Sequence, residues 1–289
     1  MSGILSIFQA GFIEELNMPS EEIALKVSPV EALTSCGFWL SLGSPTIAEC
    51  AARAGLGTVV FDCQHGLWTR DGLHAAIGLV SGKSVPVVRV SQNSQSAIGY
   101  ALDAGAEGVF VPLVETADEA AAAVKWTQYP PHGKRSGGGV RPLWEFGRYL
   151  DWSRKGLFVG LMIETRQGVD RLEEILDVPG IDMILIGSGD LALSYLGSSE
   201  ESYSAVYDTI HAILRTCNAA GVPCGCFTNR QEDREDFLRA GGSFVVVGDD
   251  ISIVYDGISD ARELSEKLDY SVSIRTNKEL VYAAGLIGN

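Results

Sequence analysis

Two apolar segments of the sequence each end at a single acidic residue, and these acids are the first candidates for chemistry. The segment LFVGLMIE ends at Glu164, and DMILIGSGD ends at Asp190. Because burying an unpaired charge is costly, an acid at the end of a buried strand requires a neutralising partner. Each acid alone could cap a helix or pair with an arginine, but two acids at one end of a barrel favour a hard divalent cation. We therefore expect Glu164 and Asp190 to bind Mg²⁺, Mn²⁺ or Co²⁺.

Three further reactive side chains come from two other apolar segments. TVVFDCQH carries Asp62 and His65, and VPVVRV carries Arg89. Histidine exchanges a proton near neutral pH, and a neighbouring carboxylate would orient it and raise its basicity. We therefore expect His65 to be catalytic, the alternatives being a core or a zinc-binding histidine. Arg89 cannot lose its charge, so it must pair with an acid such as Asp62 or Glu164, stabilise a developing oxyanion, or do both.

The elements that must position these residues are eight short apolar segments separated by helical patterns. The same junction precedes four of these segments: the end of a helix, then Ala-Gly, then a buried strand. It occurs in AARAGLGTVVFD, ALDAGAEGVFVP, NAAGVPCGCFT and LRAGGSFVVVGD. Glycine at a helix end adopts the left-handed conformation that turns the chain into the next strand. The pattern predicts an α/β fold, a (β/α)₈ TIM barrel, with its chemistry at the carboxyl ends of the strands. The predicted strands are 37–42, 58–62, 85–90, 108–113, 157–163, 182–186, 223–227 and 243–248.

The chain is expected to form one catalytic domain with an extension at each end. Residues 1–30 would form an N-terminal helical extension, 31–270 the barrel, and 271–289 a tail with a short helical piece. The connection 129–156 is too long for an ordinary link from a strand to a helix, and long connections are usually lids or binding loops. We therefore expect residues 130–150 to close over the substrate.

Composition and charge limit the class of protein. The chain has 22 Lys and Arg against 37 Asp and Glu, a net charge of −15, and so acidic a surface repels nucleic acids and anionic membranes. No apolar run reaches the ~18 residues of a membrane span. The N-terminus has no basic residue before Lys26, whereas a signal peptide begins with a positively charged region. The six cysteines lie mostly in apolar patterns typical of reduced thiols. These features predict a cytoplasmic enzyme that binds small molecules, not nucleic acid or membrane.

Two other chemistries are less well supported. No lysine follows a predicted strand, which disfavours a Schiff base on the barrel. GSGDLA matches the G-x-G-x-x-G/A dinucleotide-binding pattern and leaves an NAD-dependent oxidoreductase as an alternative. However, Asp190 in that turn would repel a pyrophosphate, and the motif falls late in the fold. We favour an interpretation in which Gly187, Ser188 and Gly189 bring backbone N–H groups close to a substrate carboxylate.

As a set, FDCQHG, VVRV, ALDAGAEGVFVP, MIET and IGSGDLA resemble the HpcH/HpaI aldolase family over roughly residues 35–255. The resemblance implies a class II pyruvate aldolase on a (β/α)₈ barrel, in which Glu164 and Asp190 bind the metal. It also implies that His65 is the catalytic base and that Arg89 stabilises the enolate oxygen.

Further implications of the resemblance concern the substrate site and assembly. Asp103 would raise the basicity of the histidine from an adjacent subunit, and the Gly189 amide would bind the substrate carboxylate. The chain would be a homo-oligomer, a trimer or a hexamer, that exchanges its last helix between subunits. Met162 stands where the family often has Gln. On a strand, Met162 and Glu164 point the same way, into the site. Unlike Gln, Met162 cannot donate a strong hydrogen bond to a substrate. Gln64 replaces a frequent Glu, and Ser188-Gly189 replaces Pro-Ala.

The sequence therefore predicts a divalent-metal-dependent lyase that cleaves or forms a C–C bond of a 2-oxo acid, with an aldehyde as the other substrate, through a metal-bound pyruvate enolate. Asp62 or Asp103 would assist His65 in moving a proton. The alternatives are an oxaloacetate decarboxylase that traps the enolate, as in the related macrophomate synthase, the NAD-dependent oxidoreductase, and a barrel that binds its ligand without turnover.

Overall fold

The computed structural model describes residues 36–197 and 202–285, so the predicted N-terminal extension, residues 1–30, lies outside the described residues. Eight parallel strands close into a barrel in which each strand pairs with its neighbours in the chain and β8 pairs with β1. The predicted (β/α)₈ barrel is confirmed, and every predicted strand overlaps an observed one. The strands are β1 (Cys36–Leu40), β2 (Thr58–Asp62), β3 (Val85–Arg89), β4 (Gly108–Val111), β5 (Phe158–Ile163), β6 (Met183–Gly187), β7 (Cys224–Phe227) and β8 (Phe244–Asp249).

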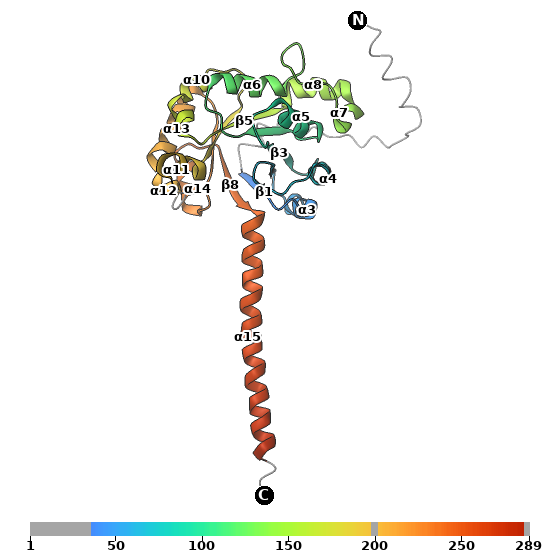
Figure 1. Cartoon of the computed structure of the whole chain (residues 1–289), viewed down its shortest axis with the longest axis vertical. Helices are drawn as coiled ribbons and strands as arrows, with labels where there is room; N and C mark the ends of the chain where they lie inside the picture. Colours follow the sequence, from blue (N-terminus) through green and yellow to red (C-terminus); the bar gives the residue numbers. More distant parts are fainter. Residues whose placement is uncertain (1–35, 198–201, 286–289) are drawn as a thin grey trace, which may run out of the picture.

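Helices alternate with the strands and cover the outside of the barrel (Figure 1). Five of them start at a Ser or Thr whose hydroxyl accepts a hydrogen bond from the first turn: Ser44, Thr69, Ser94, Thr116 and Thr165. The helices are α3 (Pro45–Arg53), α4 (Arg70–Val80), α5 (Gln95–Asp103), α6 (Ala117–Thr127), α7 (Val140–Trp144), α8 (Phe146–Gly156), α9 (Arg166–Asp170), α10 (Leu172–Leu176), α11 (Ser188–Leu196), α12 (Ser202–Ala205), α13 (Tyr207–Ala220), α14 (Gln231–Arg239) and α15 (Asp250–Gly285).

The repeated Ala-Gly junction turns the chain from a helix into the next strand as the sequence predicts. Its glycines, Gly55, Gly105, Gly221 and Gly241, have φ angles of +88°, +97°, +71° and +101°. A residue with a side chain rarely adopts this conformation, so glycine at these four positions allows the short turns that set the spacing of the barrel.

The core has two parts, because the side chains of a strand alternate between its two faces. Inside the barrel, aromatic residues and methionines fill the space, among them Trp39, Phe110, Phe158, Met162 and Phe244. Outside, Val, Ile, Leu and Ala pack between the strands and the helices. A barrel interior filled in this way is a closed core, so a ligand can bind only at an end of the barrel.

The register of the strands brings the predicted polar residues to the carboxyl end of the barrel. Asp62 and Arg89 are paired residues at the ends of β2 and β3. Glu164 directly follows β5, and Asp190 lies in the first turn of α11, directly after β6. Because β5 and β6 are neighbours, the two acids follow adjacent strands.

Residues 130–150, which were expected to close over the substrate, lie at the other end of the barrel from the predicted site. The connection follows α6 and precedes β5, and it contains α7 and α8. It therefore joins a helix to a strand, and such connections lie at the amino ends of the strands, opposite the predicted site. The sequence pattern gave the length of the connection correctly but assigned it to the wrong end of the barrel.

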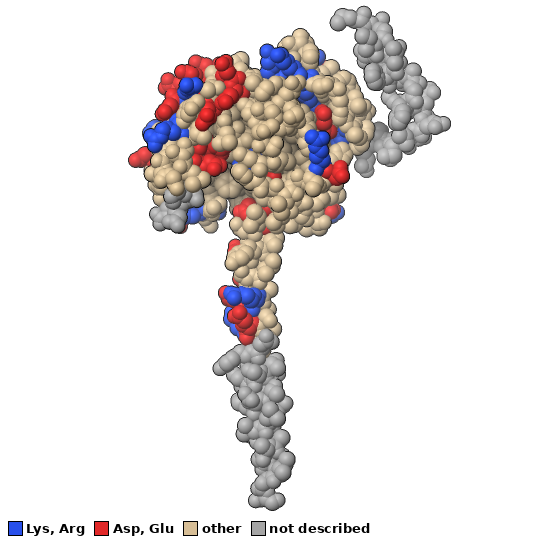
Figure 2. All heavy atoms as spheres, viewed as in Figure 1, with Lys and Arg blue, Asp and Glu red and all other residues tan. Residues whose placement is uncertain are grey.

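The chain after β8 forms one helix, α15, and the boundary expected at residue 270 falls inside it. Figure 1 shows α15 projecting away from the barrel. The part of α15 beside the barrel carries exposed apolar side chains, including Ile253, Tyr255 and Ile258, and is largely uncharged in Figure 2. Among the described residues, no helix is long and apolar enough to span a membrane.

The first residue of α15 anchors the helix to the carboxyl end of the barrel. The buried Asp250 carboxylate accepts hydrogen bonds from the backbone N–H groups of Ser41 and Leu42, at 2.8 and 2.9 Å. Ser41 in turn donates its hydroxyl to Asp62 at 3.4 Å. The start of α15 is therefore connected, through the turn after β1, to the predicted site.

Candidate active site

Glu164 is almost completely buried, yet only one of its carboxylate oxygens has a partner. The side chain sits directly after β5, and the residue is 1% exposed. Oε1 accepts a hydrogen bond from the backbone N–H of Leu113, at 2.8 Å, whereas Oε2 is buried without a hydrogen-bond partner among the described residues. Leu113 has a φ of 55°, an unusual conformation for a residue with a side chain, and this conformation allows its N–H to face the acid. A buried carboxylate oxygen without a hydrogen-bond partner is a candidate ligand for a cation.

The electrostatic surroundings of Glu164 identify its neighbours. Burial raises its pKa to about 7, the Leu113 hydrogen bond opposes this, and the negative charge of Asp190 raises the pKa further. Arg89 lowers the pKa and Asp62 raises it. These charged groups therefore lie close enough to Glu164 to act on it, as expected for a single site at the end of the barrel.

The junction of β6 and α11 approaches the Glu164 carboxylate closely. At Gly187, a Cβ atom would collide with Oε2 of Glu164, so only glycine leaves room for this oxygen. The first turn of α11 then presents Ser188, Gly189 and Asp190 at the same end of the barrel. The Ser188 hydroxyl donates to the carbonyl of Phe227 at 2.6 Å, so Ser188 offers a ligand its backbone N–H. The helix N-terminus favours an anion at this position.

Asp62 and Arg89 form a buried pair beside these acids. Arg89 donates from Nε and Nη2 to the two oxygens of Asp62, at 2.8 and 2.6 Å. Burial alone would raise the pKa of Asp62, but the hydrogen bond and charge of Arg89 outweigh it and hold the pKa below its usual range. The guanidinium also lies over the Trp39 ring, 5.1 Å from its centre. Of the two acids that the sequence left open as partners for Arg89, the structure selects Asp62.

His65 is exposed at the same end of the barrel, three residues after β2. Asp62 accepts a hydrogen bond from its backbone N–H at 3.2 Å, and from that of Gln64 at 3.0 Å. Asp62 therefore fixes the turn that carries the exposed His65. Met162 is 2% exposed and packs among the barrel-interior side chains, so it lies beneath the site.

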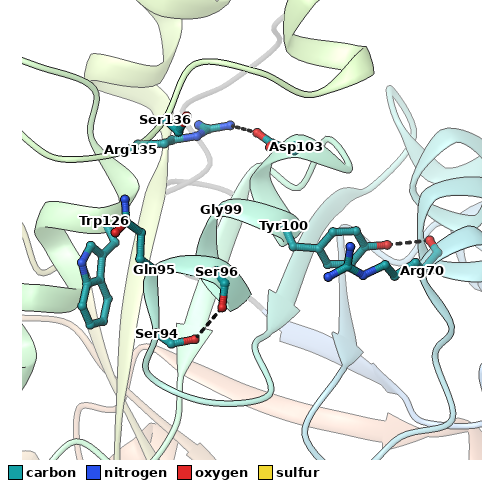
Figure 3. Close-up of a pocket in the computed structure, with 10 residues that line it drawn as sticks. All are labelled: Arg70, Ser94, Gln95, Ser96, Gly99, Tyr100, Asp103, Trp126, Arg135 and Ser136. Carbon is teal, nitrogen blue, oxygen red and sulfur yellow. Dashed lines mark hydrogen bonds and ion pairs between the residues drawn. The ribbon is translucent and has the colours of Figure 1, made fainter.

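Asp103 is the predicted site residue that the single chain does not bring to the others. It is the last residue of α5, which runs back toward the amino ends of the strands. Its carboxylate pairs with Arg135 at 3.0 Å and borders a surface cavity of about 610 Å³ (Figure 3). Within the described residues of one chain, Asp103 therefore lies apart from the carboxyl end of the barrel, where His65 stands.

Glu164 and Asp190 fit a hard cation better than a zinc site. The described residues contain no group of three or more His, Cys, Asp and Glu that could hold a metal ion. Two carboxylates, one of them with an unpartnered oxygen, suit an ion such as Mg²⁺ that keeps several water or substrate ligands. Sequence analysis missed Leu113 and Trp39, which lack reactive groups and matter only through backbone conformation and contact.

A closed barrel with acids, a histidine and an arginine at the carboxyl ends of its strands is characteristic of (β/α)₈ enzymes. The family model of the HpcH/HpaI aldolase/citrate lyase family matches residues 35–256, so the chain belongs to this family. It is a carbon–carbon lyase of the aldolase type. The open sheet of a dinucleotide-binding fold is not the fold observed, so GSGDLA is the β6–α11 turn of a barrel.

Related proteins match most of the chain. The 4-hydroxy-2-oxovalerate aldolase of Rhodococcus jostii (strain RHA1) is 34% identical over 241 residues, 82% of this chain and 93% of that protein. The 5-keto-4-deoxy-D-glucarate aldolase of Salmonella gallinarum (strain 287/91 / NCTC 13346) is 36% identical over 221 residues, 74% of this chain and 86% of the relative. The crystal structure of an HpcH/HpaI aldolase/citrate lyase family protein from Burkholderia cenocepacia J2315 has a TM-score of 0.77 at 29% identity, covering 83% of this chain and 100% of that one.

Proposed function

We propose that the chain is a divalent-metal-dependent aldolase that cleaves or forms a C–C bond of a 2-oxo acid, with an aldehyde as the second substrate. The observation that carries the proposal is the buried, unpartnered Oε2 of Glu164. The oxygen lies against the bare backbone of Gly187, and Glu164 is within electrostatic reach of Asp190. Leaving this oxygen buried without a partner is costly, and a cation shared by the two acids removes the cost.

Glu164 and Asp190 would hold Mg²⁺, Mn²⁺ or Co²⁺, which when bound would act as a Lewis acid on the 2-oxo group. The backbone N–H groups of Ser188 and Gly189, at the N-terminus of α11, would bind the substrate carboxylate. Met162 and Trp39 belong to the apolar cluster that fills the barrel interior beneath this position.

Arg89 would stabilise the negative oxygen of the pyruvate enolate. The two hydrogen bonds to Asp62 fix the guanidinium before the substrate arrives, so no reorganisation is needed when charge develops. The ring of Trp39 limits its movement on another side. The positive charge of Arg89 lowers the pKa of Glu164, which supports a place for Arg89 beside the proposed metal ligands.

His65 would move the proton of the aldehyde half of the reaction. In the cleavage direction it takes the proton from the hydroxyl group of a 4-hydroxy-2-oxo acid as the C–C bond breaks, and in synthesis it returns that proton. Asp103 of a second copy would raise its basicity, which requires a homo-oligomer. Asp62 assists by holding the turn, through the backbone N–H groups of Gln64 and His65.

The direct test is cleavage of 4-hydroxy-2-oxo acids, followed as pyruvate release, with and without EDTA. We expect activity to be lost in EDTA and restored by Mg²⁺, Mn²⁺ or Co²⁺; full activity in the chelator would refute the metal role. His65→Ala should lower kcat by about 10²-fold or more and leave pyruvate binding nearly unchanged. Oxaloacetate as the preferred substrate would favour decarboxylation, and binding of NAD would favour an oxidoreductase.

A further inference from the structure

Arg135 is a buried charge that the reaction described above does not use. It lies in the connection between α6 and α7, and its side chain is 1% exposed. The guanidinium lies over the rings of Tyr129 and Tyr149, 4.6 and 5.3 Å from their centres, and these rings meet edge-to-face. Nη1 donates to the Tyr149 hydroxyl at 2.9 Å, Nη2 donates to Oδ1 of Asp103 at 3.0 Å, and Nε has no partner among the described residues. Because arginine keeps its charge, the carboxylate of Asp103 compensates it.

The burial of the two partners is strongly unequal. The Asp103 side chain is 34% exposed, against 1% for Arg135. A pair that served only to stabilise the fold would gain little from an acid left in contact with water, because exposure weakens the attraction. The arrangement instead fixes the acid from behind and leaves it facing the cavity drawn in Figure 3.

The chain segment that follows Arg135 also closes around Asp103. A Cβ atom at Gly139 would lie 2.7 Å from Cβ and 2.8 Å from Cγ of Asp103, and Gly139 has a φ of +85°. Neither the space nor the backbone conformation admits a larger residue there. Arg135 and Gly139 therefore restrict one carboxylate from two directions.

We propose that Arg135 is a positioning residue that holds the carboxylate of Asp103 in the orientation in which it reaches His65 of a second copy of the chain. The inference rests on the proposed function. Arg135 itself is buried behind Asp103 and contacts neither His65 nor the metal position, so it acts only through the acid it holds. The cavity in front of Asp103, bordered by Arg70, Gln95 and Trp126, is where the second copy would approach.

The first test is the kinetics of Arg135→Gln in the full-length, metal-loaded protein. We expect kcat for aldol cleavage to fall by about tenfold or more, with KM for the 2-oxo acid changed by less than about twofold, because the metal position is untouched. Arg135→Lys keeps the charge but not the planar fork, so its loss should be smaller. Arg141→Gln is the matched control: Arg141 donates to the backbone carbonyls of His74 and Ala104, and its loss should lower Tm without lowering kcat.

The second test separates positioning from stability by mixing subunits. In a mixture of Arg135→Gln and His65→Ala chains, reassembled after dissociation, some sites combine an intact His65 with an intact Arg135 from a neighbouring chain. Activity should rise to about a quarter of the wild-type value, the statistical share of such sites in equal mixtures. An effect of Arg135 on its own chain alone could not be restored in this way.

The proposal is overturned if Arg135→Gln and Arg135→Lys keep wild-type kcat, or if mixing restores Asp103→Asn but not Arg135→Gln. Failure of the proposed function gives a different result, because the wild-type protein would then show no metal-dependent aldol cleavage, or His65→Ala would retain full turnover. The same mixtures therefore test the two claims separately.

Discussion

Two buried carboxylates at the carboxyl end of the barrel, Asp62 and Glu164, differ in how their charge is satisfied. Asp62 is 2% exposed and accepts from Arg89, from two backbone N–H groups and from a serine hydroxyl, and its pKa is lowered. Glu164 is 1% exposed, accepts one backbone N–H, and its pKa rises to about 7. The two carboxylates are therefore equally buried, but their pKa values shift in opposite directions. Asp62 has partners within the fold that keep it ionised, whereas Oε2 of Glu164 has none among the described residues.

The largest expected effect is a difference in stability between variants of Asp62 and of Glu164. Asp62→Asn leaves Arg89 buried without a counter-charge, so the free energy of unfolding should fall by about 3–5 kcal/mol. Glu164→Gln removes a charge that lacks a partner and should not destabilise the metal-free protein. Chemical denaturation of both variants in EDTA measures the difference, and equal losses would show that the two acids are equivalent.

The pH dependence of stability sharpens the same comparison. In EDTA, the raised pKa of Glu164 means that the folded state holds its proton more tightly than the unfolded state, so ionisation opposes folding. The free energy of unfolding of the wild type, relative to Glu164→Gln, should therefore fall by up to about 3 kcal/mol as pH rises from ~4.5 to ~7. Asp62 has the opposite sign: its contribution is present above its unfolded pKa and is lost as pH falls. A wild-type and a Glu164→Gln protein with parallel pH profiles would contradict this assignment.

A smaller effect is expected from crowding the unpartnered oxygen of Glu164. Gly187→Ala places a methyl group against Oε2 and should weaken metal affinity by about 10–100-fold, as loss of ligand orientation does. Gly189→Ala is the matched control, because nothing lies within 4 Å of a Cβ there. Isothermal titration with Mn²⁺ measures both affinities. Equal affinities for the two variants would mean that Oε2 is not a ligand.

Most of the barrel could be predicted from sequence because its determinants are local. Buried parallel strands are continuous apolar runs, and Gly55, Gly105, Gly221 and Gly241 mark where helices turn into strands. The connection 129–156 was misplaced because its length carries no information about which end of the barrel it occupies. The boundary at 270 fell within α15 because a long, mixed-charge helix gives no local stop signal there.

The sequence predicts which residues gather at the candidate site, but not which acid pairs with Arg89. Sequence places Glu164, Asp190, Asp62 and Arg89 at the ends of strands, where a barrel gathers them. It cannot distinguish Asp62 from Glu164 as the partner of Arg89, because that choice depends on strand register and side-chain reach. The contribution of Leu113 depends on a φ angle of 55°, which its side chain does not signal.

The Asp250 carboxylate connects the projecting helix α15 to the carboxyl end of the barrel. The same side chain begins the helix and holds the backbone of Ser41 and Leu42, next to the hydroxyl that reaches Asp62. A displacement of the start of α15 would therefore disturb the turn that holds the Ser41 hydroxyl against Asp62, the partner of Arg89.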